Sequence, residues 1–173
     1  MKKATFPAYL STFVLCAAFW LLLTGSFDHQ ELIAGAIVSV VVALFSAKFL
    51  IHENAFWLIH PARFFSLLIY ILIIFPWELL KANLDVAFRA FGPGPRVNPG
   101  IVKVPVGLKS DYGRAMLADS ITLTPGTITM DLTEEDGQTW FYVHWIDVKD
   151  AEGTKAGDII KGTLEKWVRR IWK

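Results

Sequence analysis

The pattern of hydrophobic and polar positions divides the chain into two parts. Residues 1–91 hold three long apolar segments, at about residues 6–23, 32–51 and 63–91, and shorter apolar runs follow from residue 101 onward. At about 1.5 Å per residue, such segments are long enough to cross a hydrocarbon core of about 30 Å. The pattern therefore predicts a membrane protein, with three N-terminal transmembrane helices followed by a small α+β soluble domain.

The first apolar segment contains no charged residue and follows Lys2 and Lys3. A cleaved signal peptide would show the same basic start and apolar run. No small-residue cleavage site follows the apolar core, and Leu15 stands where a lipoprotein site would need a small residue. We therefore expect a retained helix.

The second segment places four small residues at intervals of four. Gly35, Ser39, Ala43 and Ala47 would form one ridge along the helix. Small residues let helices approach closely in lipid, so the ridge is a candidate helix-packing face. An Ala- and Val-rich helix can also produce this spacing by chance.

The third segment is apolar up to Trp77 and then becomes amphipathic. We expect one long helix, kinked near Pro76, whose last part leaves the membrane. Its charged side chains lie three or four apart with alternating sign, at Glu78, Lys81, Asp85 and Arg89. The simpler interpretation is a solvated face of paired charges. The alternative is that Glu78 and Asp85 line an ion route at the membrane boundary.

A Pro- and Gly-rich linker, residues 92–100, separates the long helix from the soluble domain, residues 101–173. Alternation and turn residues predict the elements of this domain. They are a strand at 101–106, placed at a sheet edge by Pro105, a helix from Asp111 to about Ala118, a strand at 121–124, a hairpin of 127–133 and 139–148, and a helix at 155–172. Such a small unit buries a marginal core and is expected to lean on a partner or on the membrane surface.

Composition removes several classes of function. The net charge of +1 gives no reason to expect nucleic-acid binding, and a single cysteine, Cys16, cannot form an internal disulfide. The mean hydropathy of +0.43 is high for an ordinary soluble domain. The sequence lacks phosphate-binding, dinucleotide-binding and zinc-protease motifs, and its four histidines are scattered. We therefore predict no catalytic residue, no cofactor and no metal site, and a chain that is not an enzyme.

Three strings of residues carry a resemblance to a known family. They are PWELLKANLDVA from Pro76, LADSITLTPGTITMDL from Leu117, and YVHWIDV from Tyr142. In this order, after three apolar segments, they resemble the E subunit of the Mrp-type multisubunit Na+/H+ antiporters. Homologous subunits of energy-converting membrane hydrogenases and related archaeal complexes are similar, and the strings do not separate the two contexts.

The resemblance implies an accessory or assembly subunit of a complex that exchanges Na+ for H+. The alternative is the equivalent subunit of a redox-driven ion pump, such as a membrane-bound hydrogenase or a sulfur reductase. Implied partners are the small and large subunits of the antiporter module, membrane lipid and, in the alternative, a redox arm. The structural or docking motif would comprise Thr124, Pro125, Gly126, His144, Trp145 and Asp147.

The resemblance also implies a multi-pass protein of a prokaryotic cell membrane with a cytoplasmic C-terminal domain. With three crossings the N-terminus would lie outside, although Lys2 and Lys3 favour the inside. Counting the flanking Lys and Arg residues gives four on one side and three on the other, so charge does not decide this topology.

Overall fold

The structure is a computed structural model that describes residues 5–49, 60–94, 97–149 and 153–172. The end of the second predicted segment (50–51) and two residues of the predicted linker (95–96) lie outside the described residues, as does the side chain of Ala47. The chain divides into two compact units, residues 1–60 and 61–173.

The first unit is a helical hairpin. Helix α1 (Phe6–Thr24) packs against α2 (His29–Phe49). Gly25 ends α1 in the left-handed conformation, with φ +60°, and its N–H donates to the carbonyl of Leu21. This conformation favours glycine because it has no Cβ, so the tight turn between the two helices begins at this residue.

One long helix opens the second unit. It consists of α3 (Pro61–Ile69), a π-helical turn η2 (Tyr70–Ile74) and α4 (Phe75–Phe91). Pro76 has no N–H to offer the preceding turn, and the backbone N–H of Phe75 donates to the carbonyl of Tyr70 instead. Where a kink near Pro76 was predicted, the helix has a wider π-turn just before the proline.

The α+β domain follows with elements β1 (Gly100–Val106), α5 (Asp111–Leu123), β2 (Thr127–Glu135), β3 (Gln138–Trp145) and α6 (Gly153–Ile171). The strands form an antiparallel sheet in the order β1-β3-β2, so Pro105 lies in an edge strand as predicted. Asp136 and Gly137, both with positive φ, turn β2 into β3. The core consists of inward side chains of the sheet and of both helices: Val104, Leu117, Ile121, Phe141, Val143, Val168 and Ile171.

The predicted fold class is confirmed in its order of elements. Within the described residues, three helices long and apolar enough to cross a membrane, Phe6–Thr24, His29–Ser46 and Pro61–Phe91, precede a small domain of three strands and two helices.

The strand predicted at residues 121–124 is wrong. Helix α5 runs through Leu123, and its N-cap is Ser110, with Asp111 in the first turn. Ile121 and Thr122 are β-branched, which favours a strand locally. Tertiary packing overrides this preference. As part of helix α5, Ile121 faces the core of the domain and is fully buried.

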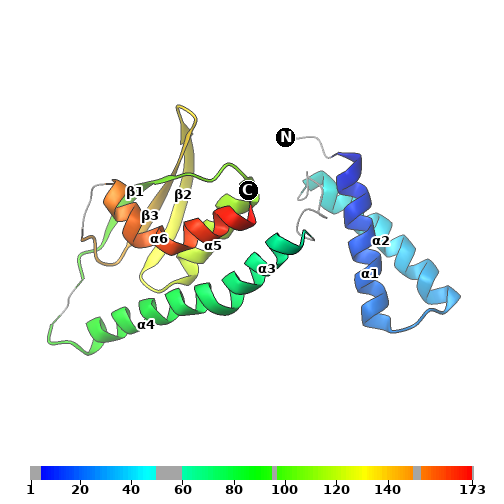
Figure 1. The fold of residues 1–173 in the computed structure, drawn as a ribbon, viewed down its shortest axis with the longest axis horizontal. Coiled ribbons are helices and arrows are strands. Elements are labelled where there is room, and N and C mark those ends of the chain that lie inside the picture. The colour runs from blue at the N-terminus through cyan, green and yellow to red at the C-terminus, as the bar shows by residue number, and fades with distance from the viewer. Residues whose placement is uncertain (1–4, 50–59, 95–96, 150–152, 173) are drawn as a thin grey trace. The chain divides into compact units, whose positions relative to one another are not determined.

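The long helix lies along the domain (Figure 1). Helix α6 contacts α3 and the π-turn, and the hydroxyl of Tyr70 donates to Ser120 Oγ of α5 at 2.6 Å. Near the other end, Arg89 of α4 reaches Asp147 just after β3. The helix and the domain are thus one unit, fastened at two points.

Candidate functional site

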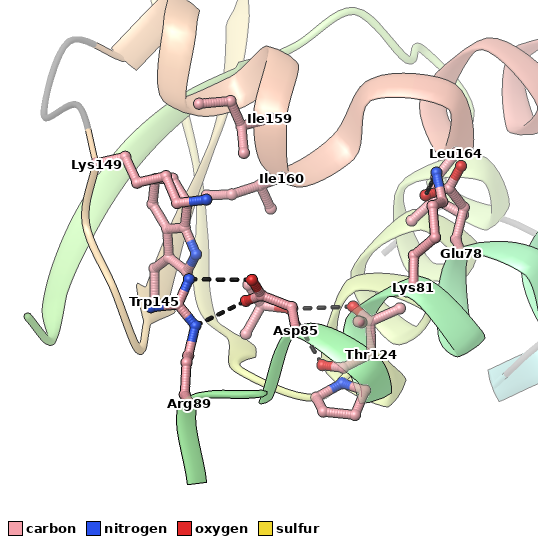
Figure 2. A pocket seen from close by; sticks show the side chains of 13 residues that line it. Glu78, Lys81, Asp85, Arg89, Thr124, Trp145, Lys149, Ile159, Ile160 and Leu164 are labelled. Atoms are coloured by element: carbon pink, nitrogen blue, oxygen red, sulfur yellow. Dashed lines mark hydrogen bonds and ion pairs between the residues drawn. The ribbon is translucent and has the colours of Figure 1, made fainter. Parts of the chain in front are cut away.

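A pocket of about 410 Å³ lies between the long helix and the domain. Its wall combines charged side chains of α4 with the Thr124–Pro125 turn, Trp145 and Lys149 beside the end of β3, and apolar side chains of α6 (Figure 2). Residues predicted separately, as an ion-route stripe and as a docking motif, meet in this one place.

Arg89 is the centre of the charged wall. Its Nε and Nη2 donate to the two carboxylate oxygens of Asp85, at 2.8 and 3.1 Å, and its Nη1 donates to Asp147 Oδ2 at 2.6 Å. The guanidinium fork suits such two-sided pairing, and hydrogen bonds between charged groups are among the strong ones. The arginine side chain is only 14% exposed, so the pairing with Asp147 is sheltered from water.

The other two charges of the stripe, Glu78 and Lys81, pair with each other at 2.7 Å. Figure 2 shows them beside Leu164, apart from the Asp85–Arg89 pair. The expected i,i+3 and i,i+4 pairs therefore exist, and they line a pocket of the domain. The i,i+4 pair gains a third member, Asp147, from a distant part of the chain.

The turn after α5 fixes the opposite wall. Thr124 Oγ1 and Thr127 Oγ1 both donate to the carbonyl of Ile121, each at 2.7 Å, and the two hydroxyls lie 3.1 Å apart. Gly126 has φ +93°, and a Cβ there would come within 2.9 Å of Ile146 and 3.7 Å of Val86. A glycine is favoured by both the left-handed conformation and the close approach of Ile146, whereas Val86 of α4 lies at an ordinary contact distance.

The remaining residues of the predicted motif separate in space. Trp145 is buried and lines the pocket, and Asp147 holds Arg89. His144 points to the other face of the sheet, where it is half-buried between its cross-strand partners Ile101 and Ile128. The histidine and the aspartate therefore do not meet, in agreement with the two-residue period of a strand.

The ridge residues belong to the first unit. Gly35, Ser39 and Ala43 are buried. A Cβ on Gly35 would lie 2.5 Å from Trp20 Cδ1, so the indole of α1 occupies the space that a side chain would need. This part of the ridge packs within the hairpin itself.

A second charged cluster joins α6 to the loop after β1. Glu165 accepts hydrogen bonds from the N–H of Gly107 at 2.7 Å, from Arg169 at 2.9 Å and from Lys161. Burial acts to raise the pKa of Glu165, but these donors outweigh it and hold the pKa below its ordinary value. The carboxylate therefore stays charged and anchors the helix.

Sequence reasoning did not find Tyr70, Ser120, Lys149 or Trp20. Tyr70 is the polar member of an otherwise apolar stretch from Phe64 to Phe75, apart from Ser66, and this was the available signal. Among the described residues, no group of three or more His, Cys, Asp or Glu side chains is placed to hold a metal ion. The pocket lies at the joint between the long helix and the domain, by which we mean the place where the two pack together. Each carboxylate there has a cationic partner.

Comparison with known proteins agrees with this architecture. A family described as "Na+/H+ ion antiporter subunit" matches residues 13–171. The E1 subunit of the Na(+)/H(+) antiporter of Staphylococcus aureus (strain bovine RF122 / ET3-1) is 33% identical over 161 residues, which cover 91% of this chain and 92% of that protein.

Two solved structures are also similar. A chain of the membrane-bound sulfane sulfur reductase (MBS), an archaeal respiratory membrane complex, is 42% identical with a TM-score of 0.72, covering 96% of this chain and 99% of that one. A chain of the Mrp complex from Dietzia sp. DQ12-45-1b is 26% identical with a TM-score of 0.41, covering 60% of this chain and 91% of that one. The resemblance drawn from the three sequence strings is thus confirmed, and the chain belongs to the family of Na+/H+ ion antiporter subunits.

Proposed function

We propose that this chain is an accessory subunit of a multisubunit membrane complex that exchanges Na+ for H+, and that its task is assembly. The observation that carries the proposal is the match to the staphylococcal E1 antiporter subunit over 91% of the chain. The match includes both the apolar helices and the soluble domain, so the whole chain is comparable with an antiporter subunit.

The site supports a structural role in that complex. Asp85 is bound at both oxygens by Arg89, and Glu78 is paired with Lys81. Carboxylates that carry a moving cation need to exchange partners, whereas these are held by fixed counter-charges. The pocket therefore favours a non-catalytic subunit that fixes the angle between the long helix and the domain.

A second candidate is the equivalent subunit of a redox-driven membrane complex. It is favoured by the chain of the sulfane sulfur reductase, which is 42% identical over nearly its whole length. The same joint would serve either complex, because neither use requires a reacting group on this chain.

An affinity tag on this chain, expressed with its neighbouring genes, tests both candidates. Antiporter subunits should copurify, and vesicles that contain the complex should exchange Na+ for H+. Deleting the chain should lower the recovery of the complex and its exchange in the same proportion. Copurification of a redox subunit with sulfane sulfur reduction would select the second candidate, and purification without any partner would contradict both.

We further propose that the complex lies in a prokaryotic cell membrane with the α+β domain in the cytoplasm. Membrane-length helices and bacterial and archaeal relatives support the first part. The second part is what the resemblance to the E subunit of the Mrp-type antiporters implies. Protease digestion of inverted vesicles should remove the domain, whereas digestion of intact cells should leave it whole, and the opposite result would contradict this orientation.

A further inference from the structure

The long helix has two unlike faces. The face toward the domain is polar or half-buried, with Tyr70, Glu78 and Arg89 along it. The rest of its circumference is a broad, exposed apolar strip over the whole length of the helix. Its members are Phe64, Phe65, Ile69, Ile71, Leu72, Ile73, Trp77, Leu80, Leu84, Phe88 and Phe91, each between 38% and 91% exposed.

The domain covers the inner face over a distance close to the thickness of a membrane. The two fastening points, Tyr70 and Arg89, are 19 residues apart, which is about 28 Å of helix. A hydrocarbon core is about 30 Å thick. If the helix crossed the bilayer upright over this stretch, the domain would have to stand in the hydrocarbon beside it.

The domain is not built for that environment. Helix α6 lies against α3 and the π-turn, and it exposes Lys166, Arg169 and Arg170. Helix α5, bound to Tyr70, exposes Asp119. Charged side chains in the hydrocarbon are costly and normally face protein or water. The domain that lies against the long helix must therefore stand in water.

We propose that α3, η2 and α4 form an interfacial helix, which lies in the plane of the membrane with its apolar strip in the acyl chains and the domain in water. Helices of this kind carry Trp, Phe and Leu on one face and charged residues on the other. The chain then crosses the membrane twice, through α1 and α2, although the third helix is also long and apolar enough to cross.

We expect lipid to cover the strip, because a membrane-spanning segment of the same chain comes shortly before it in the sequence. Helix α2 is an apolar segment of membrane-spanning length, and only residues 50–60 separate its end from the start of α3 at Pro61. The described residues leave this apolar strip exposed, and so short a connection to a membrane-spanning segment lets it enter the bilayer without any other protein.

The distribution of charge supports two crossings independently. The connection between α1 and α2, residues 25–28, contains Asp28 and no Lys or Arg. With two crossings, Lys2, Lys3, Lys48 and Arg63 all lie on the side of the domain, which gives four against none. The positive-inside rule, which is undecided between the sides for three crossings, then places that side in the cytoplasm.

Labelling from one side of the membrane tests the number of crossings. In a Cys16→Ser background of the whole complex, single cysteines replace Lys3, the exposed Phe27 and the exposed Lys109. A membrane-impermeant maleimide applied to intact cells should label only Phe27→Cys, and applied to inverted vesicles it should label the other two. Labelling of Lys3→Cys and Lys109→Cys from opposite sides would overturn the proposal.

Depth measurements test the occupant. Spin labels at Leu72, Leu80 and Phe88 span 16 residues, or about 24 Å of helix. An interfacial helix should give all three labels one shallow depth, with high collision rates with oxygen and low rates with a water-soluble nickel chelate. A depth that changes by tens of ångströms from Leu72 to Phe88 would mean a crossing helix. Low collision rates with both reagents would mean that a protein subunit covers the strip, and either result would overturn the proposal.

Discussion

Arg89 and Asp147 are 58 residues apart in the sequence, and their side chains meet at 2.6 Å from Nη1 to Oδ2. The arginine side chain is 14% exposed and the aspartate 22%. The first comes from the last turns of the long helix and the second from the segment after β3. This one contact therefore closes the joint between the helix and the domain.

Arg89→Gln or Asp147→Asn should loosen that joint. A hydrogen bond between charged, largely buried groups contributes about 1.5–3 kcal/mol, so Asp147→Asn should lower the free energy of unfolding by about this amount. Arg89→Gln should lower it by at least as much, because it also loses the bonds to Asp85. Thermal unfolding of the purified chain in detergent, followed by tryptophan fluorescence, measures it. Lys81→Gln is the matched control, because the Lys81 side chain is 50% exposed and its pair with Glu78 should contribute only about 0.5 kcal/mol or less. Equal effects at both pairs would contradict the role of the Arg89–Asp147 contact.

Asp85→Asn should leave transport intact. The side chain is 55% exposed, and Arg89 keeps its second partner, Asp147, when Asp85 loses its charge. The complex should assemble in normal yield and retain its Na+-dependent exchange in vesicles. If Asp85 borders an ion route, its carboxylate supplies a hard oxygen ligand, and the apparent Na+ affinity would fall at unchanged yield. That selective loss would show that this chain lines the ion route and is not only a structural subunit.

Gly126→Val should strain the turn that supports α4. The backbone φ of +93° costs about 1–3 kcal/mol for a β-branched residue, and the added Cβ would meet Ile146 at 2.9 Å. The free energy of unfolding of the chain and the recovery of the complex should both decline, and ion exchange should decline in proportion to recovery. Gly137→Val is the control, since its φ of +75° is similar but nothing lies within 4 Å of its Cβ position. Normal assembly with abolished transport would make the turn part of the mechanism.

Gly35→Leu should separate the helices of the hairpin. The side chain would have to displace Trp20, whose Cδ1 lies 2.5 Å from the position of a Cβ, and overpacking of this kind costs about 1–3 kcal/mol. Recovery of the assembled complex after detergent extraction measures the effect. Ala36→Leu changes the next residue, which is exposed, and should be tolerated. Undiminished recovery with Gly35→Leu and Ala43→Leu combined would rule out a packed ridge.

Acid should weaken the anchor at Glu165. Its folded pKa lies below the ordinary value of 4.5, so its contribution to stability is complete above pH 4.5 and is lost as the pH falls through the folded pKa. Glu165→Gln should lower stability near neutral pH and remove this part of the pH dependence. Unfolding temperatures between about pH 3 and pH 7 compare the two chains across this titration. Parallel curves for wild type and variant would exclude Glu165 as the titrating group.

Local patterns predicted much of this architecture. Pro105 placed β1 at the sheet edge, and alternation placed the hairpin of β2 and β3, although the register shifts between Thr129 and Asp131. These features depend on neighbours in the sequence, through the missing N–H of proline and the two-residue period of a strand. Ile121 shows the limit: its side-chain branching favours a strand, whereas burial against the sheet and α6 keeps it in a helix.

The site itself was predicted in pieces. The Glu78–Lys81 and Asp85–Arg89 pairs follow from helical spacing alone. That Asp147 would complete the second pair, or that Tyr70 would find Ser120, depends on how helix and domain pack, which no local period encodes. Such contacts, 50 and 58 residues apart, become visible only in three dimensions.

The π-turn at Tyr70–Ile74 has a consequence for where the two fastening points lie. In an unbroken α-helix, 19 residues advance about 100° beyond whole turns, so Tyr70 and Arg89 would point in different directions. A π-turn takes one extra residue without advancing the rotation, which cancels about that angle and brings both side chains to the same side. The extra residue thus restores the rotational alignment of Tyr70 and Arg89 about the helix axis. Removing one residue between 70 and 74 should leave an ordinary helix with both side chains still aligned, whereas adding one should turn Arg89 away from Asp147 while Tyr70 stays in place.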